Sequence, residues 1–206
     1  NVYKAHVSFE NQAQLPTNHC WMEAVENCTV KIKKAGLKYK KATDDNWSNY
    51  TSNSDISLEA GHKVSFKGGS ADSRITWTDK DKGVFMGITG GQYKRGGDIT
   101  SLVVGDDYEA YGATVTGIAF LDGFKSQTGL IDASELILPM TKLVANAYKS
   151  MFDSCTNLVS GPQILPATTL GNTCYRNMFN ECKKLTYAPE LPAATSVGSG
   201  SYQKRS

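Results

Sequence analysis

A block of residues near the C-terminal end of this sequence occurs twice at a constant offset. Its marker residues return 27 positions later. A fixed period of roughly 20 to 50 residues is typical of stacked arrays, in which each unit buries its apolar face against the next. Such an array presents a surface for binding and does not by itself build a catalytic pocket. The paired residues are Leu138-Pro139 with Leu165-Pro166, Thr141 with Thr168, Leu143 with Leu170, Tyr148 with Tyr175, Met151-Phe152 with Met178-Phe179, Cys155 with Cys182, and Leu158 with Leu185.

Within one unit, the sequence predicts a short helix followed by a very short strand. An apolar stripe at helical spacing indicates the helix. Leu-Pro cannot lie inside it, because proline lacks an amide hydrogen and restricts the residue before it, so this pair marks the start of each unit. The segment 185–188, which precedes Pro189, suits a short parallel strand. The residues of the stripe are Leu170, Cys174, Met178 and Phe179.

The period divides the chain into two expected domains. Residues 1–118 form the first domain, and its first part, 1–29, is an unassigned leader segment with enough apolar residues to dock on a sheet as an edge strand or a short helix. Residues 119–206 form the second domain. Its expected units are a degenerate half-unit at 119–137, full units at 138–164 and 165–190, and a partial unit at 191–206.

Successive units should share one dry apolar column. Phe152 should then stack on Phe179, and Cys155 should lie about one strand spacing, roughly 4.8 Å, from Cys182. Together with Cys174, these two cysteines are expected to be buried small apolar residues.

The order of Leu-Pro, Met-Phe, Cys and Leu in segment 164–193 resembles the leucine-rich repeats of the BspA-like type, which are common in surface proteins of Bacteroides-like bacteria. The resemblance implies a short leucine-rich-repeat solenoid. It also implies an adhesion protein, since members of that family are thought to bind host matrix proteins or other bacterial cells.

The N-terminal half has the pattern of short strands separated by glycine turns, which predicts an antiparallel sheet or small sandwich. Segment 90–97 is dense in glycine and is expected to be a flexible hairpin loop. This half also resembles the region that precedes the repeats in the same surface proteins. We therefore predict an α+β, mainly β fold, with an N-terminal antiparallel β domain followed by a short leucine-rich-repeat solenoid. The expected strands cover 30–33, 37–40, 56–58, 64–66, 75–77, 84–86 and 99–104.

Charge and hydropathy restrict the class of partner. With 22 basic and 20 acidic residues the formal net charge is +2, so there is no electrostatic case for nucleic acid. No apolar run approaches the roughly 18 residues that a membrane-spanning helix needs. The chain begins at Asn1 without a signal peptide, as a processed export product does. We expect an extracellular or cell-surface location, with anchoring to the outer membrane as one option. The oligomeric state is not indicated.

The sequence shows no constellation typical of catalysis or metal binding, so we predict a non-enzymatic protein without metal or cofactor. The three histidines, His6, His19 and His62, are scattered, without partners at metal-ligand spacing. Cys20 and Cys28 could close a short loop as a disulfide or remain free thiols.

Two functions remain open. In the first, the repeat surface presents positions that differ between copies to a host or bacterial surface protein or glycan. These candidate binding residues are Ser160 against Tyr187 and Gln163 against Glu190. In the alternative, the N-terminal sheet is a carbohydrate-binding module carried on a repeat spacer. Its candidates for stacking on sugar rings are Trp47, Tyr50, Trp77 and Tyr93.

Overall fold

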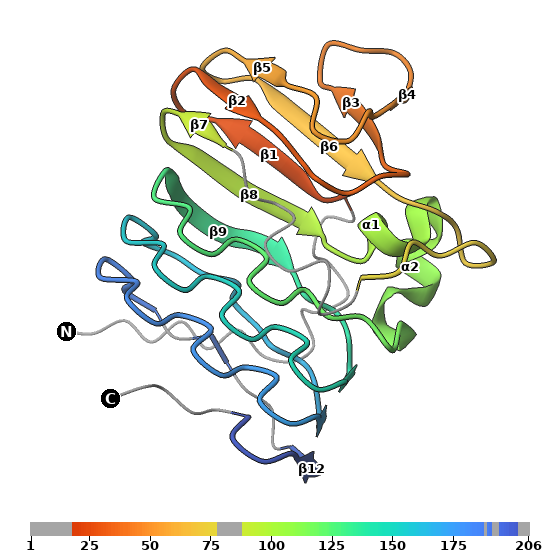
Figure 1. Ribbon diagram of the computed structural model, residues 1–206, viewed down its shortest axis with the longest axis vertical. Helices are drawn as coiled ribbons and strands as arrows, with labels where there is room; N and C mark the ends of the chain where they lie inside the picture. The colour runs from red at the N-terminus through yellow and green to blue at the C-terminus, as the bar shows by residue number, and fades with distance from the viewer. Residues whose placement is uncertain (1–17, 78–87, 188, 191–193, 202–206) are drawn as a thin grey trace.

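The computed structural model describes residues 18–77, 88–187, 189–190 and 194–201. In this part of the chain, three β-sheets form most of the regular structure (Figure 1). The helices are short, and none of those described is both long and apolar enough to cross a membrane. The prediction of a mainly β chain is confirmed. Residues 1–17 of the leader, the expected strand 84–86 and much of the partial unit lie outside the described residues.

The largest sheet has six strands in the order β4-β3-β6-β1-β8-β9. Within it, β1 lies antiparallel between β6 and β8. β9 pairs with the other side of β8 in parallel orientation, so the sheet is mixed. The strands are β1 (Trp21–Ala24), β3 (Lys38–Lys41), β4 (Ser48–Asn49), β6 (Lys63–Lys67), β8 (Tyr93–Asp98) and β9 (Leu130–Ile137).

The position of β1 differs from the prediction, because part of the leader segment becomes an internal strand of this sheet. The ring of Trp21 packs directly over Gly96 of β8, where any Cβ would overlap the ring. Lys63 Nζ lies 3.8 Å from the centroid of the Trp21 ring. The glycine-dense segment 90–97 is therefore no flexible hairpin loop, since its glycine provides the close approach that a strand pairing with β1 requires.

A second sheet has three antiparallel strands, with β2 (Cys28–Val30) between β5 (Ile56–Leu58) and β7 (Thr89–Gly90). The predicted strands at 56–58 and 64–66 are confirmed as β5 and part of β6.

Segment 99–104 was predicted as a strand, and this prediction is wrong. It contains α1 (Ser101–Val104), which is followed by α2 (Tyr108–Tyr111) and flanked by the 3-10 turns Gly105–Asp107 and Gly112–Thr114. The side chains of α1 are all buried. A continuous apolar run does not distinguish a buried helix from a buried strand, which explains the error. Segment 75–77 is also not a strand.

The third sheet is parallel and joins residues at the 27-residue offset. Lys142 pairs with Thr169, and Thr169 pairs with Ser196. The turns between the strands are also joined, with the N–H of a residue donating to the carbonyl 26 positions later, as the Tyr148 N–H donates to the Cys174 carbonyl at 2.9 Å. We call the described residues from 138 to 201 the C-terminal ladder. Its strands are β10 (Lys142–Leu143), β11 (Thr169–Leu170) and β12 (Ser196–Val197).

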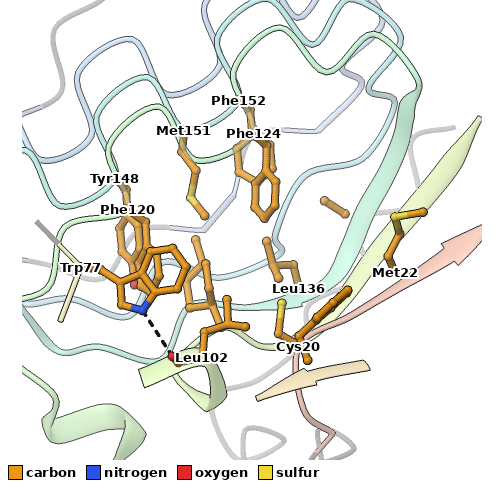
Figure 2. Close-up of a cluster of buried hydrophobic side chains, with 14 of the residues drawn as sticks. Cys20, Met22, Trp77, Leu102, Phe120, Phe124, Leu136, Tyr148, Met151 and Phe152 are labelled. Atoms are coloured by element: carbon orange, nitrogen blue, oxygen red, sulfur yellow. Dashed lines mark hydrogen bonds between the residues drawn. The ribbon is translucent and has the colours of Figure 1, made fainter. Parts of the chain in front are cut away.

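Aromatic rings stack along the ladder in columns (Figure 2). Phe124 stacks on Phe152 at 5.4 Å between ring centroids, and Phe152 stacks on Phe179 at 5.3 Å. The stacking of Phe152 on Phe179 confirms that prediction. A second column contains Phe120, Tyr148 and Tyr175, and Trp77 lies 5.3 Å from Phe120, which connects this column to the N-terminal core.

The turns of the ladder replace the predicted short helix. Every fourth residue has a positive φ, a conformation that interrupts an α-helix and that residues other than glycine adopt at a cost of roughly 1–2 kcal/mol. Hydrogen bonds to the next turn offset this cost, as the Phe152 N–H donates to the Met178 carbonyl at 2.9 Å. Segment 185–187, predicted as part of a strand, is also irregular. The positive-φ residues are Asn146, Ser150 and Ser154, followed by Thr173, Asn177 and Glu181.

The predicted fold class is therefore corrected. The chain is not α+β, because its α-helices are four-residue segments. Nor does an antiparallel domain precede a leucine-rich-repeat solenoid: the described residues form three sheets, and the largest is mixed and extends past residue 118 through β9. The half-unit expected at 119–137 supplies that edge strand. The division into two domains stays a prediction.

Candidate functional site

The four candidate binding residues lie on two neighbouring segments, 159–165 and 186–190. The Thr186 N–H donates to the Val159 carbonyl at 3.0 Å, and the Glu190 N–H donates to the Gln163 carbonyl at 2.9 Å. Gln163, Tyr187 and Glu190 are exposed, whereas Ser160 is half-buried. The 27-residue offset thus brings residues that are distant in sequence onto one stretch of surface.

Tyr187 is the most prominent residue of this surface, because 75% of it is exposed. Val159, which accepts the hydrogen bond from the neighbouring Thr186, is 41% exposed. The equivalent of Tyr187 one unit earlier is Ser160, so the tyrosine is not required to hold the ladder together. We call Val159, Ser160, Gln163, Tyr187 and Glu190 the ladder surface.

An apolar groove lies beside the ladder surface and encloses about 240 Å³. It runs along residues 134–139, at the end of β9, and includes Gln163 and Ile164 from the adjoining segment. This groove is not among the sites predicted from the sequence. Pro162 and Pro166 are the features of the sequence that indicate an interrupted pairing here, because a residue without an amide hydrogen cannot donate to a neighbouring strand.

A second, more polar cleft of about 700 Å³ lies between the small sheet and β3. Lys41, Glu59 and His62 are among its lining residues. Lys41 Nζ already donates to the Ser57 carbonyl at 3.2 Å, and the Asn27 side chain accepts the Ala60 N–H at 2.9 Å. These polar groups hold the walls of the cleft together.

In the N-terminal part, His19 lies in a cluster of ionisable side chains with Asp106 and Lys67. His19 Nε2 lies 2.8 Å from Asp106 Oδ1, and Lys67 Nζ lies 2.6 Å from Asp106 Oδ2. The His19 ring makes edge contacts with Trp47 and Tyr108 at centroid distances of 4.9 and 5.0 Å. Burial lowers the pKa of His19, whereas the hydrogen bond from Lys67 lowers the pKa of Asp106. Lys67 and His19 each form a hydrogen bond with one oxygen of the Asp106 carboxylate, so we interpret the cluster as structural.

Three of the four aromatic residues proposed to stack on sugars are buried. The Tyr50 hydroxyl donates to the Ser54 carbonyl, Trp77 Nε1 donates to the Leu102 carbonyl, and the Tyr93 hydroxyl donates to Gln127. These side chains belong to the core and cannot lie against a sugar ring at the surface. Trp47 is half-buried beneath Lys67.

The five cysteines are free thiols. Cys20 and Cys28 are not joined as a disulfide. Burial raises the pKa of Cys20 and of Cys155 to about 12, so neither has the character of a nucleophile. Cys155 and Cys182 occupy equivalent places, where each Sγ donates at 3.0 Å, to the carbonyls of Phe124 and Phe152 respectively.

Two residues of β8, Arg95 and Asp98, are charged in type and buried, which the sequence did not predict. Arg95 is almost completely buried, and its guanidinium carbon lies 5.3 Å from the centroid of Phe124 and 5.7 Å from that of Tyr93. Asp98 is buried at the end of the strand, where it accepts hydrogen bonds from the Thr100 N–H and hydroxyl at 2.8 and 2.6 Å. Burial raises the pKa of Asp98 to about 6.

No group of three or more His, Cys, Asp and Glu side chains is placed to hold a metal ion in the described ranges. Comparisons with protein families, characterised proteins and solved structures found no match to this chain.

Proposed function

We propose that this protein is a non-enzymatic interaction protein of the cell surface, and that it binds a protein or glycan ligand through the ladder surface. The observation that carries the proposal is the exposure of Tyr187 beside Val159. A tyrosine presents a large apolar contact area with a polar end, and such residues supply much of the affinity in protein interfaces. Nothing in the packing of the ladder requires an aromatic ring at this position.

The backbone beneath Tyr187 supports the same proposal. The ladder is joined by hydrogen bonds at each turn, and the rings of its aromatic columns are buried except for the half-buried Phe179. A ligand would therefore meet a surface that needs little ordering on binding, which reduces the entropic cost of association. The resemblance to BspA-like surface proteins favours a host or bacterial surface ligand and an extracellular location.

The alternative function, a carbohydrate-binding module in the N-terminal part, has weaker support. Of its four proposed stacking residues, Trp47 alone is not buried, and its ring already contacts His19 and Lys67. Stacking on a sugar would compete with these contacts.

The substitution Tyr187→Ser tests the proposal, because it introduces the residue that the preceding unit carries. Tyr111→Ser is the matched control, since Tyr111 is 45% exposed on α2. Purified wild-type and variant proteins would be applied to immobilised extracellular-matrix proteins and to a glycan array. We expect Tyr187→Ser to weaken binding at least tenfold and Tyr111→Ser to leave it unchanged. Equal binding by both variants would refute the proposal, and loss of glycan binding in Trp47→Ala alone would favour the alternative.

A further inference from the structure

The apolar groove arises where two neighbouring segments separate. At its start, the Val159 N–H donates to the Ile131 carbonyl at 2.9 Å, and the Ala133 N–H donates to the Ser160 carbonyl at 2.7 Å. Beyond this point segment 159–165 pairs with segment 186–190 instead of with β9, since the Leu165 N–H donates to the Glu190 carbonyl at 3.0 Å. The end of β9 is paired with β8 on one edge, and its other edge, which faces this segment, lies beside a cavity.

The shape and lining of the groove suit an extended peptide. Six consecutive residues, 134–139, form one side, which corresponds to roughly 20 Å of extended chain. The enclosed volume of about 240 Å³ has room for one large side chain but not for a folded element. The apolar contacts would come from the partly exposed Ile137, Pro139, Ile164 and Pro166, since Leu136 and Leu138 are buried.

The charge along the groove indicates the flanking chemistry of this peptide. Glu135 is exposed and is the charged residue of the described lining. Glu190, also exposed, forms a parallel bridge with Ile164, another lining residue. Two carboxylates beside an apolar slot favour a ligand with basic residues next to its apolar side chain.

We propose that the groove binds an extended segment of a partner protein, with one large apolar side chain in the cavity and a lysine or arginine next to it paired with Glu135. Peptides commonly bind beside a strand edge in this way, where alternate side chains enter pockets. This proposal rests on the proposed function, in that it takes the surface ligand to be a protein and names the chemistry of its docking segment.

The test uses the full chain and fluorescein-labelled heptapeptides in a fluorescence polarisation assay. The first peptide is Ser-Lys-Ser-Leu-Ser-Lys-Ser; in the second, serine replaces the central leucine, and in the third, glutamate replaces both lysines. We expect the first peptide to bind at least tenfold more tightly than either of the others. Equal binding of the three peptides would overturn the proposal.

Ala113→Trp blocks the groove without disturbing the core, because Ala113 is exposed and lines the cavity. Thr116→Trp is the control, since Thr116 is exposed and does not line it. We expect Ala113→Trp to lower the affinity for the leucine peptide at least tenfold, with an unchanged melting temperature, and Thr116→Trp to have no effect. Glu135→Gln should reduce the preference for lysine over glutamate at least threefold. Unchanged affinity in Ala113→Trp would refute the proposal.

Two other occupants would also overturn it. If deletion of residues 1–17 raised the affinity for the leucine peptide tenfold or more, the occupant would be this chain's own N-terminal segment. If sedimentation showed a dimer that Ala113→Trp abolishes, the occupant would be a second copy. Tyr187→Ser separates the two proposals. If this variant loses the surface ligand and still binds the leucine peptide, both proposals are supported. If it loses the surface ligand and the wild-type protein does not bind the leucine peptide either, the proposed function is supported and the groove proposal is refuted.

Discussion

The N-terminal sheet and the C-terminal ladder bury their apolar side chains by different rules. In the six-stranded sheet, neighbours come from distant and irregular places in the sequence, as in the order β4-β3-β6-β1-β8-β9. In the ladder, a residue meets its own equivalent 27 positions away, as Phe152 meets Phe179. A substitution in the ladder should therefore act on one column of like residues, whereas one in the sheet should act on a pair with a specific fit.

The largest expected effect is in the middle of the phenylalanine column. Phe152 is completely buried between Phe124 and Phe179, so Phe152→Ala should lower the free energy of unfolding by about 3–5 kcal/mol. Phe179→Ala is the matched variant at the end of the described column, where the ring is only half-buried, and should cost about half as much. Urea unfolding followed by tryptophan fluorescence would measure both values. Equal losses would show that position in the column has no influence.

The next effect tests the specific fit within the sheet. Gly96→Ala would place a methyl group in the Trp21 ring, which is buried and held by β1, so we expect a loss of about 2–3 kcal/mol. In the ladder, Gly161→Ala would approach the ring edge of Phe179 to 2.8 Å, but this ring is half-buried and can shift. It should cost about 1 kcal/mol. A larger loss for Gly161→Ala in the same unfolding assay would reverse the comparison.

The smallest effect concerns Asp98, at the junction where β8 pairs with β9. Burial raises the pKa of Asp98 to about 6, above the value near 4 that it has in an unfolded chain. The folded state then holds its proton more tightly, so stability falls as pH rises from about 4 to about 6. The ionised carboxylate therefore destabilises the folded state at neutral pH.

Asp98→Asn keeps an oxygen that accepts from Thr100 and removes this ionisation. We expect the variant to be more stable than wild type at pH 7 and to have a flatter stability profile between pH 4 and pH 7. Thermal unfolding across that range would measure the profiles, and Asp122→Asn, at a partly exposed turn residue, is the control. A parallel shift of the whole profile would show that the titration of Asp98 does not cause the change.

The two regions also differ in how far the sequence predicts them. The constant offset was enough to pair Phe152 with Phe179, because both partners carry the same residue type. It did not reveal the turn conformation: apolar residues at intervals of about four suggest a helix, although a positive φ at every fourth residue, as at Ser150 and Ser154, produces a similar spacing. Periodicity reports which residues are buried and not the backbone that buries them.

In the N-terminal part, local alternation predicted β5 and β6 but not the position of β1 or β8. Gly96 lies in a segment whose glycines suggested a loop. The reason for a glycine at this position is its contact with the Trp21 ring, and these two residues are 75 positions apart in the sequence. Of the candidate residues chosen from differences between copies, Gln163, Tyr187 and Glu190 are exposed and Ser160 is half-buried, and their role in binding stays a prediction. The groove was not predictable in the same way, since it depends on where two segments stop pairing.

The thiols of Cys155 and Cys182, which donate to backbone carbonyls, can report when the ladder opens. Cys155 is completely enclosed, whereas Cys182, one turn further along, is partly accessible. An alkylating reagent can reach the Cys155 sulfur only after the adjoining turn has detached, whereas Cys182 is already partly exposed in the folded state. The rate at which Cys155 becomes modified would therefore measure how often this turn of the ladder opens.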